Sequence, residues 1–360
     1  MKKRVLFVIS SELNNAGVPA VTMGIVENLN EYCQFDIIVS GTDAGYYDSV
    51  FLSYGGKIFR TPNISYLDHK LGVIKRGRIV YEAVINACNE NSYDIIHCEN
   101  GFESGYALRA AKICGIPLRI VHSHGTYKIK GKNILLNLYK LHCKGLIDKY
   151  STVRLACSNV SGRSLFKSSF INILNPVDVD YYSKISKEKH ESINLLQIGY
   201  YCNLKNQIFS LKVLSELLNQ GANSHLYYIG FDNGSGYYQK LQKNVHEMAL
   251  ESCVTFLPSD YPKNDILGKI DFLLLPSTNE GLPLVVLEAQ AANVHSIISD
   301  VVTTDVDFGL CSFLPISNAC IWVREILDLY GYNKVADKNK LEIVNKKNYM
   351  NQIKNAFYKV

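Results

Sequence analysis

Two glutamates in one short segment have the types and spacing that best suit chemistry on a ligand. Glu280 and Glu288 lie in the run NEGLPLVVLEA of this 360-residue chain. Gly281 permits a tight turn, and Pro283 suits the start of a helix that continues from Leu284. The free N–H groups of such a helix start point at any anion above them. We expect Glu280 to accept sugar hydroxyls and Glu288 to accept those of a ribose. The alternative is two surface glutamates, one of which favours the helix dipole.

A loop around Lys205 has the features of a phosphate site. It runs GYYCNLKN and starts at Gly199, which ends an apolar run and lets the backbone approach a ligand. Lys205 and Asn206 stand just before an amphipathic stretch, where the lysine ammonium and the helix N–H groups could share a diphosphate. We expect Lys205 to stabilise charge that develops on a leaving diphosphate. The alternative is a solvated loop lysine.

Histidines mark the ends of two other apolar runs. The segment VHSHG holds His122 and His124, and we expect only one of them to face a ligand cleft, the other being a core histidine. His97 ends the run DIIH, where a structural role is the simpler interpretation. Neither His122 nor His124 has second and third metal ligands nearby in the sequence, so we expect no metal site.

Alternating strands and helices must position these segments. Apolar runs such as Arg4–Ile9 and Leu118–His122 alternate with amphipathic stretches such as Val80–Asn89. This order is typical of a parallel sheet with both faces covered and with ligands at the carboxyl ends of its strands. The pattern restarts at Ile193–Ile198, after a polar break that begins at Pro176. We expect an α/β protein of two Rossmann-like domains facing a cleft. The first would be residues 1–175, joined by a C-terminal helix at 343–360, and the second residues 176–342.

The segment that contains Glu280 is similar to one in a known family. With Pro276 and Ser277 before it, Glu280-x7-Glu288 resembles the E-x7-E region of family 4 retaining glycosyltransferases, and the later run SDVVTT resembles their capsule and exopolysaccharide branch. The loop at Gly199 matches the family's G-R-x-x-x-x-K-N at its glycine, lysine and asparagine. Tyr200 replaces the arginine, which removes one of two cations that would neutralise the donor phosphates.

The resemblance implies a GT-B fold and a specific reaction. A hexose would pass from a nucleoside diphosphate sugar, with a preference for UDP and with no separate cofactor, to a hydroxyl of a glycan or polyprenyl-linked acceptor. The product would be a surface polysaccharide, formed with retention. The implied catalytic residues are His124, Glu280 and Lys205. The implied donor-binding residues are Gly17, Gly199, Lys205, Asn206, Gly281, Leu282, Pro283, Leu284 and Glu288.

Gly17 belongs to the run NNAGVP, which is similar to the family's glycine-rich loop after the first strand. There Gly17 would let the backbone approach the donor or the acceptor. The run lacks the second and third glycines of G-x-G-x-x-G, which argues against a nicotinamide enzyme.

Composition favours a reducing compartment. The ten cysteines form no C-x-x-C pair, and the apolar run Val5–Ile9 is too short for the core of a signal peptide. No stretch reaches the roughly 18 apolar residues of a membrane span. We therefore expect a cytoplasmic protein.

Positive charge is concentrated in one segment. The formal net charge is +5, and residues 126–150 hold lysines 128, 130, 132, 140, 144 and 149 with Asp148 as their one acid. Such a patch could meet phosphate, lipid headgroups or nucleic acid. At 100° per residue, we expect Ile134, Leu135, Leu138 and Leu141 to pack on the domain and Lys140 and Lys144 to point outward. With the resemblance, we expect peripheral binding to the inner, anionic membrane face through Lys128, Lys130, Lys132, Lys140 and Lys144, and no nucleic acid. The alternative is a solvated amphipathic helix.

Two other functions stay open at this point. A nucleotide-sugar epimerase could use the same fold and cleft without an acceptor, and it would release an epimer instead of forming a polymer. A non-catalytic partner subunit could keep the fold without turnover, since Tyr200 stands where the family has arginine. Donor-dependent release of nucleoside diphosphate by the pure chain would argue against that second alternative.

Overall fold

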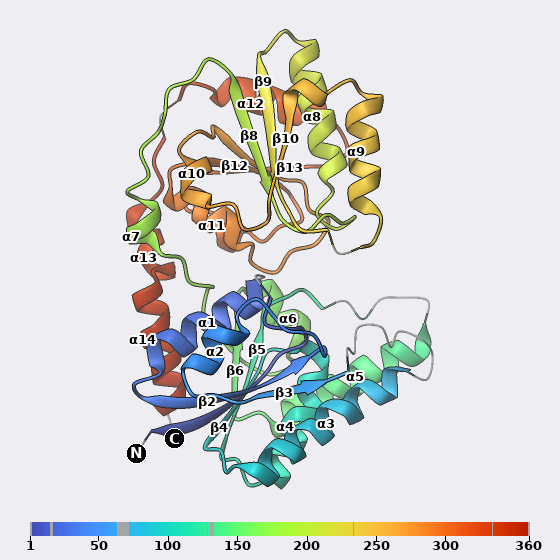
Figure 1. Ribbon diagram of the computed structural model, residues 1–360, viewed down its shortest axis with the longest axis vertical. Helices are drawn as coiled ribbons and strands as arrows, with labels where there is room; N and C mark the ends of the chain where they lie inside the picture. The colour runs from blue at the N-terminus through green and yellow to red at the C-terminus, as the bar shows by residue number, and fades with distance from the viewer. Residues whose placement is uncertain are drawn as a thin grey trace. The chain divides into compact units, whose positions relative to one another are not determined.

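The computed structural model describes residues 2–14, 17–62, 72–127, 129, 133–232, 234–332 and 334–358. The chain divides into two compact units, each built on its own sheet (Figure 1). The first unit comprises Met1–Asn175 and Lys347–Val360, and the second comprises Pro176–Lys346. The chain thus leaves the first unit at Asn175 and returns to it at Lys347, where we had expected the return at residue 343.

The sheet of the first unit has seven strands in the order β3-β2-β1-β4-β5-β6-β7. All of its pairings are parallel, and the strands are apolar runs because such sheets are covered on both faces. The order reverses between β1 and β4, which makes their carboxyl ends a topological switch point. The strands are β1 (Lys3–Val8), β2 (Cys33–Ser40), β3 (Ile58–Thr61), β4 (Ile95–Cys98), β5 (Leu118–Ser123), β6 (Val153–Ala156) and β7 (Ile171–Asn172).

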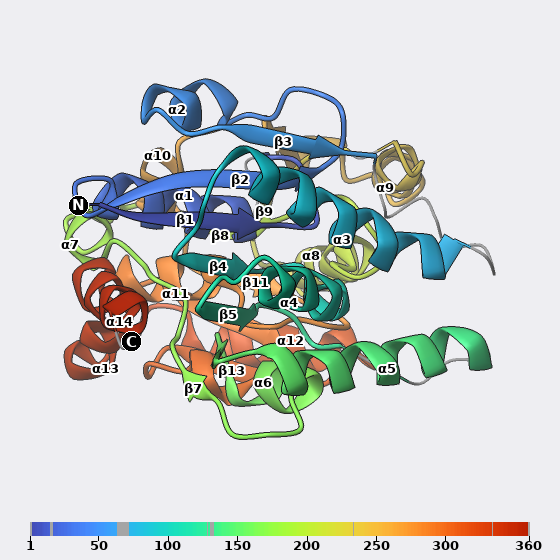
Figure 2. The ribbon, with the colours of Figure 1, turned by 90° about the horizontal axis from the view of Figure 1, so that it is seen from below.

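Different helices cover the two faces of this sheet. Leu6 and Val8 belong to a core that they share with α3, α4 and α5, which lie side by side in Figure 2. Phe7 and His97 lie on the opposite face, where the Phe357 ring of α14 is 5.8 Å from that of His97. The helices are α1 (Gly17–Leu29), α2 (Asp48–Ser53), α3 (Gly72–Glu90), η2 (Gly101–Glu103), α4 (Ser104–Ile113), α5 (Ile134–Tyr150), α6 (Asn159–Leu165) and α14 (Lys346–Tyr358).

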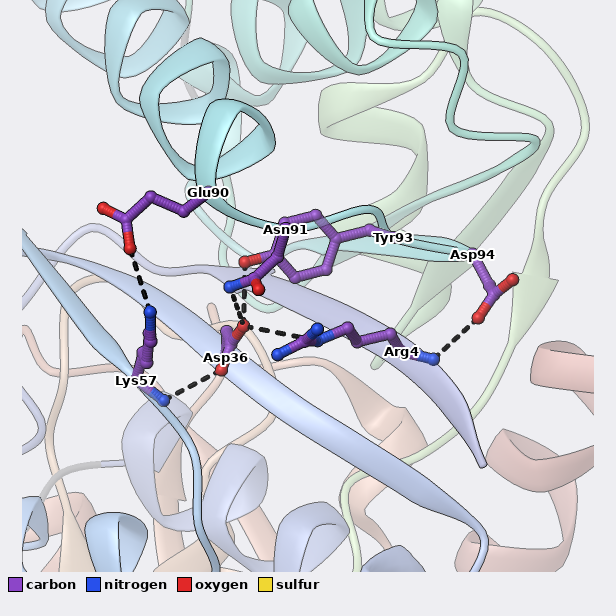
Figure 3. A network of polar contacts seen from close by, with 7 residues as sticks. All are labelled: Arg4, Asp36, Lys57, Glu90, Asn91, Tyr93 and Asp94. Atoms are coloured by element: carbon purple, nitrogen blue, oxygen red, sulfur yellow. Dashed lines mark hydrogen bonds and ion pairs between the residues drawn. The ribbon is translucent and has the colours of Figure 1, made fainter. Parts of the chain in front are cut away.

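A buried carboxylate ties together the amino-terminal halves of the strands (Figure 3). Asp36 on β2 is fully buried and accepts hydrogen bonds from the Tyr93 hydroxyl and the Lys57 backbone N–H, both at 2.8 Å. Arg4 on β1 supplies positive charge, with its Nε 3.8 Å from the Asp36 carboxylate. Parallel sheets bind their ligands at the other ends of the strands, so this network is structural.

The second unit has a six-stranded parallel sheet in the order β10-β9-β8-β11-β12-β13. Its order reverses between β8 and β11, and its core contains the fully buried Tyr228 and Trp322. The strands are β8 (Ile193–Ile198), β9 (Ser224–Ile229), β10 (Val254–Leu257), β11 (Phe272–Leu275), β12 (His295–Ser299) and β13 (Cys311–Leu314). The helices are α7 (Val179–Tyr182), α8 (Gln207–Asn219), α9 (Tyr237–Glu247), η3 (Glu251–Cys253), α10 (Lys263–Leu267), α11 (Leu284–Ala291), η4 (Thr304–Val306), α12 (Ala319–Leu329) and α13 (Lys338–Val344).

The expected α/β class with two parallel sheets is confirmed. The sequence pattern missed β3, β7 and β13, all of which are short edge strands. An edge strand is covered on fewer sides than a central one, so its apolar signal is weaker. Within the described ranges, no helix combines the length and hydropathy needed to cross a membrane.

Candidate active site

The switch point of the second sheet brings together two loops that are distant in the sequence. β8 and β11 are neighbours, and the loops that leave their carboxyl ends carry Lys205 and Glu280. A hydrogen bond from the Thr278 backbone N–H to the Leu204 carbonyl, at 2.8 Å, joins the two loops. Doubly wound sheets bind ligands at such a point. The structure therefore assembles two of the predicted residues where a ligand is expected.

Lys205 and Glu280 form an ion pair at this point. The Lys205 Nζ lies 2.7 Å from Glu280 Oε1, and the two side chains are only 22% and 12% exposed. A partly buried pair is screened less by salt than a surface pair. The two residues were predicted separately, one for the diphosphate and one for the sugar, whereas the structure shows that each restrains the other.

Side chains that the sequence analysis did not select fix the backbone around Lys205. Gln197 on β8 is buried, and its amide donates a hydrogen bond to the Lys205 carbonyl at 2.7 Å. Ser210 in turn donates to the Gln197 side chain at 2.8 Å. The signal available in the sequence was a glutamine inside a mostly apolar strand, because a buried amide needs partners.

Gly199 and Asn206 each satisfy a backbone requirement of this loop. Gly199 has a φ of +148°, and a Cβ there would lie 3.1 Å from Lys205 Cε, so the missing side chain leaves room for the lysine stem. Asn206 precedes α8 in the left-handed conformation, with a φ of 53°, which asparagine tolerates better than most residues. Its side-chain amide donates to the Pro276 carbonyl at 3.2 Å, which adds a second link between the loops.

Glu288, on the second turn of α11, has a cationic partner of its own. Lys263 Nζ lies 2.7 Å from both oxygens of the Glu288 carboxylate. Burial and the adjacent Glu288 carboxylate raise the pKa of Tyr182 above its usual value, which keeps that phenol protonated as a donor. A ribose that binds Glu288 must share or displace Lys263. The sequence analysis missed Lys263 because nothing in its local run distinguishes it from a surface lysine.

The expected start of a helix at Leu284, with Pro283 at its entry, is confirmed. The helix begins at Leu284, and Pro283 precedes it with φ −70° and ψ 109°, so the proline is the capping residue and not part of the first turn. A proline has no side-chain acceptor for the first N–H groups of the helix, which can therefore face an anion. Leu282 and Pro283 are buried, which anchors the loop that follows Gly281.

In the first unit, His124 belongs to a buried polar group at the carboxyl ends of β4 and β5. The rings of His122 and His124 lie 4.0 Å apart. Glu99 Oε1 is 3.7 Å from His124 Nε2 and 3.6 Å from His97 Nε2. The expectation that only one of the paired histidines would face this side is wrong, because residues i and i+2 of a strand share a face.

The same group contains atoms that could bind a metal ion. The ligand atoms of His97, Glu99 and His122 all lie within 4.8 Å of one another, so the sheet supplies the neighbours that the sequence did not show. Burial lowers the pKa of His97 to about 4 and that of His122 well below its usual value. Burial also opposes charge on His124, but Cys157 and Glu99 together raise its pKa to about 10. The neighbours of His124 thus favour its charged form, whereas burial disfavours the charged forms of His97 and His122.

Gly17 is the first residue of α1, and a Cβ there would meet open space. The structure thus gives no steric reason for glycine at this position. Residues 15 and 16 of the same loop lie outside the described residues. Contact between Gly17 and the donor or acceptor stays a prediction.

The expectation that Lys140 and Lys144 of α5 point outward is wrong. Lys144 is buried and donates a hydrogen bond to the Ser164 carbonyl at 2.9 Å, and Lys140 lies over the Phe102 ring, 5.7 Å from its centre. The residues expected to pack on the domain are instead exposed, by 72, 60, 57 and 45% for Ile134, Leu135, Leu138 and Leu141. Lys128, Lys130 and Lys132 lie outside the described residues.

The reason for the reversal is that α5 has two apolar sides. Its other side packs through Tyr139, Cys143, Leu146 and Ile147. Gly105 on α4 allows the close approach, since a Cβ there would lie 2.7 Å from the Cys143 carbonyl oxygen. A helical projection with 100° per residue identified one apolar side of α5. It could not show which side of α5 the neighbouring helix covers.

The chain is similar to known glycosyltransferases. Residues 192–330 match the family described as Glycosyl transferases, group 1. The chain is 29% identical over 327 residues to EpsF of Bacillus subtilis (strain 168), covering 86% of this chain and 82% of that protein. It is 25% identical over 300 residues to the capsular polysaccharide biosynthesis glycosyltransferase CapH of Staphylococcus aureus, covering 81% and 80%.

A more distant relative is named for a lipid-linked acceptor. The UDP-Gal:alpha-D-GlcNAc-diphosphoundecaprenol alpha-1,3-galactosyltransferase of Escherichia coli is 23% identical over 233 residues, covering 59% of each protein. Among solved structures, HepE of Anabaena in complex with UDP and glucose has a TM-score of 0.75 at 13% identity, covering 99% of this chain and 100% of that one. That likeness concerns the fold. Because the matched family and relatives are glycosyltransferases, the epimerase alternative is not favoured. Residues 192–330 form a group 1 glycosyltransferase domain, and the two parallel-sheet units have the fold of GT-B glycosyltransferase structures.

Proposed function

We propose that this glycosyltransferase moves a hexose from a UDP-linked sugar to a hydroxyl of a polyprenyl-linked glycan, with retention, in the synthesis of a surface polysaccharide. The observation that carries the proposal is the Lys205–Glu280 ion pair at the switch point of the second sheet. UDP is supported by the solved HepE complex, the polysaccharide product by the name of the Staphylococcus aureus relative, and the polyprenyl-linked acceptor by the name of the Escherichia coli relative.

The reaction assigns a distinct part to each group of the site. The bond from the anomeric carbon to the diphosphate oxygen breaks, and the acceptor hydroxyl forms its bond on the same face, passing its proton to the departing diphosphate. Lys205 and the first N–H groups of α11 neutralise the charge that grows on that diphosphate. Glu280, once Lys205 turns to the phosphates, accepts hydroxyls of the hexose, and Glu288 accepts those of the ribose.

The test is a donor screen followed by a transfer assay. A bound nucleotide sugar raises the melting temperature of the chain, so UDP- and GDP-linked hexoses are compared by thermal shift. The selected donor is then incubated with and without a polyprenyl-diphosphate-linked sugar, and released UDP and glycolipid are both measured. We expect UDP release that depends on the acceptor. An epimerised UDP-sugar without transfer would contradict the proposal, as would a chain that binds donor and releases no UDP with any acceptor tested.

The proposal includes peripheral binding to an anionic membrane, where a polyprenyl-linked acceptor lies. The exposed side of α5, with Ile134, Leu135, Leu138 and Leu141, suits the boundary between headgroups and acyl chains. The lysines of residues 126–150 other than the buried Lys144 suit the anionic headgroups, and a lysine near such a surface contributes about 1 kcal/mol. This arrangement reverses the expected roles on α5, since the leucines and not Lys144 face outward.

A further inference from the structure

Three buried side chains at the switch point of the first sheet converge through polar atoms that form no hydrogen bond. His97 lies on β4, Glu99 follows that strand, and His122 lies on β5. All three side chains are buried. Among the described residues, neither ring nitrogen of His97 or of His122 has a hydrogen-bond partner, and Glu99 Oε1 has none either. Buried polar atoms are almost always satisfied, so a group of this kind points to a ligand that contacts all three residues.

The pairing of β4 with β5 explains why these atoms meet. The two strands are parallel, and His97 is in register with Ile120. Residues two apart along extended chain share a face, which places His122 with Ile120 and Glu99 with His97. His97 Nε2 lies 3.6 Å from Glu99 Oε1, and the ligand atoms of the three side chains all lie within 4.8 Å of one another. The site is thus a product of the sheet and needs no sequence motif.

Two imidazoles and one carboxylate are a ligand set that suits zinc. In tetrahedral sites zinc binds histidine nitrogen at about 2.0–2.1 Å, so neighbouring ligand atoms lie roughly 3.3 Å apart. The observed 3.6 Å between His97 Nε2 and Glu99 Oε1 is close to that spacing. Magnesium and calcium prefer sites made of oxygen ligands. A set with two nitrogen ligands therefore favours zinc over these ions.

Neighbouring side chains orient and enclose the three residues. The Thr22 hydroxyl of α1 lies 2.5 Å from Glu99 Oε2, which leaves Oε1 to face the histidines. The Phe7 ring stacks on His97 with 5.0 Å between the ring centres, and the Phe357 ring of α14 meets it edge-on at 5.8 Å. Metal sites use an outer hydrogen bond to orient a ligand and an apolar wall to limit access of water.

We propose that His97, Glu99 and His122 form a buried zinc site that joins the carboxyl ends of β4 and β5. Three protein ligands leave zinc one further position, as in sites that bind a water molecule or a substrate group. The rings of His122 and His124 lie 4.0 Å apart, so zinc would also fix the ring on which His124 packs. The expectation of no metal rested on neighbours in the sequence, whereas these ligands come from two strands. Zinc content is measured without any sugar substrate, so this test is separate from that of the transfer reaction.

The first measurement is the metal content of the chain by mass spectrometry, after purification without a metal-affinity step. Because the ligands are buried, zinc should bind as the first unit folds and should survive dialysis against a weak chelator. We expect about one zinc ion per chain, and its loss in His97→Gln and in Glu99→Gln. His225→Gln is the matched control. It changes a histidine of the second unit whose Nε2 lies 2.8 Å from the Thr255 hydroxyl, and it should leave the zinc content unchanged.

The second measurement is the effect of zinc on the refolded chain. A ligand that binds only the folded state raises the melting temperature, so refolding with zinc should give a higher value than refolding with a strong chelator. Magnesium should not replace zinc in this assay. Thr22→Val removes the outer hydrogen bond to Glu99 and keeps all three ligands. It should weaken zinc affinity roughly 10–100-fold in competition with a coloured chelator, which keeps the test open if the ligand variants fold poorly.

Three results would overturn the inference. The first is a purified chain without zinc that, when refolded with zinc, neither retains it nor melts at a higher temperature. The second is zinc that remains in His97→Gln and in Glu99→Gln and is lost in Cys157→Ser, since Cys157 is a buried thiol after the neighbouring strand β6. The third is magnesium that stabilises the refolded chain as well as zinc does.

Discussion

Lys205 Nζ lies 2.7 Å from Glu280 Oε1, so the cation expected to meet the donor diphosphate is paired with the carboxylate expected to hold the sugar. When the donor binds, this ion pair must break, so that Lys205 contacts the phosphates and Glu280 contacts the hexose. Such an exchange leaves both charges compensated, whereas removal of one partner takes that compensation from the other, partly buried charge, which is costly. Variants at these positions should therefore be interpreted as a pair.

Lys205→Ala should lower kcat about 10²–10³-fold, because it removes a positive group aimed at the charge that grows on the diphosphate. The measurement is a double-mutant cycle with Glu280→Gln, using steady-state UDP release. If Lys205 acts on the phosphates, its loss should cost nearly as much in the Glu280→Gln background. If the effect of Lys205→Ala disappears in that background, the lysine serves only to hold Glu280 in place.

Glu280 and Glu288 should differ in the kinetic parameter that they control. Glu288→Ala removes a contact with the ribose in both ground and transition states, so it should mainly raise KM for the donor. Glu280→Ala loosens the hexose at the reacting carbon, so it should mainly lower kcat. Lys263→Met should act as a milder form of Glu288→Ala, since it removes the partner that holds the Glu288 carboxylate in place, and Lys240→Met on the exposed side of α9 is its control. Unchanged kinetics in both glutamate variants would leave this segment with a structural role alone.

The apolar side of α5 should govern binding to vesicles. Leu138→Ser with Leu141→Ser should weaken cosedimentation with anionic vesicles about 10²-fold, because each buried leucine contributes on the order of 1.5 kcal/mol. Added salt should weaken binding of the unaltered chain as well, since lysines contribute through screened charge. Leu52→Ser, at an exposed leucine on α2, is the matched control. Equal binding by the double variant and the unaltered chain, or no binding at low salt, would contradict a membrane role for α5.

Asp36 should matter for stability and not for turnover. Asp36→Asn removes a fully buried charge that accepts from Tyr93 and Lys57, and hydrogen bonds to charged groups contribute about 1.5–3 kcal/mol each. We expect a clear fall in the melting temperature by calorimetry, with kcat/KM unchanged below the transition. Glu90→Gln breaks an ion pair whose side chains are 56% and 51% exposed, so it should change stability little. A turnover defect in Asp36→Asn without loss of stability would contradict the structural role assigned to this network.

Sequence patterns alone were enough to predict the α/β class, the two successive halves and the loops that carry Lys205, Glu280 and Glu288. Central strands of a parallel sheet are buried on both faces, so their sequences are continuous apolar runs that can be recognised along the chain. The motif residues follow those runs directly, and the carboxyl ends of parallel strands share one edge. The edge strands β3, β7 and β13 were not predicted, because they are short and less completely covered than the central strands.

Contacts between side chains that are distant in the sequence became known only from the fold. Glu99 reaches His124 because β4 and β5 pair in parallel, and Glu288 reaches Lys263 because α10 lies beside α11. The outward side of α5 was settled by its packing on α4, where Gly105 admits the Cys143 backbone. Periodicity identifies apolar sides and strand ends, which are local properties of the chain. It cannot rank two apolar sides or pair distant charges, because those choices depend on the shape and charge of neighbours from elsewhere in the sequence.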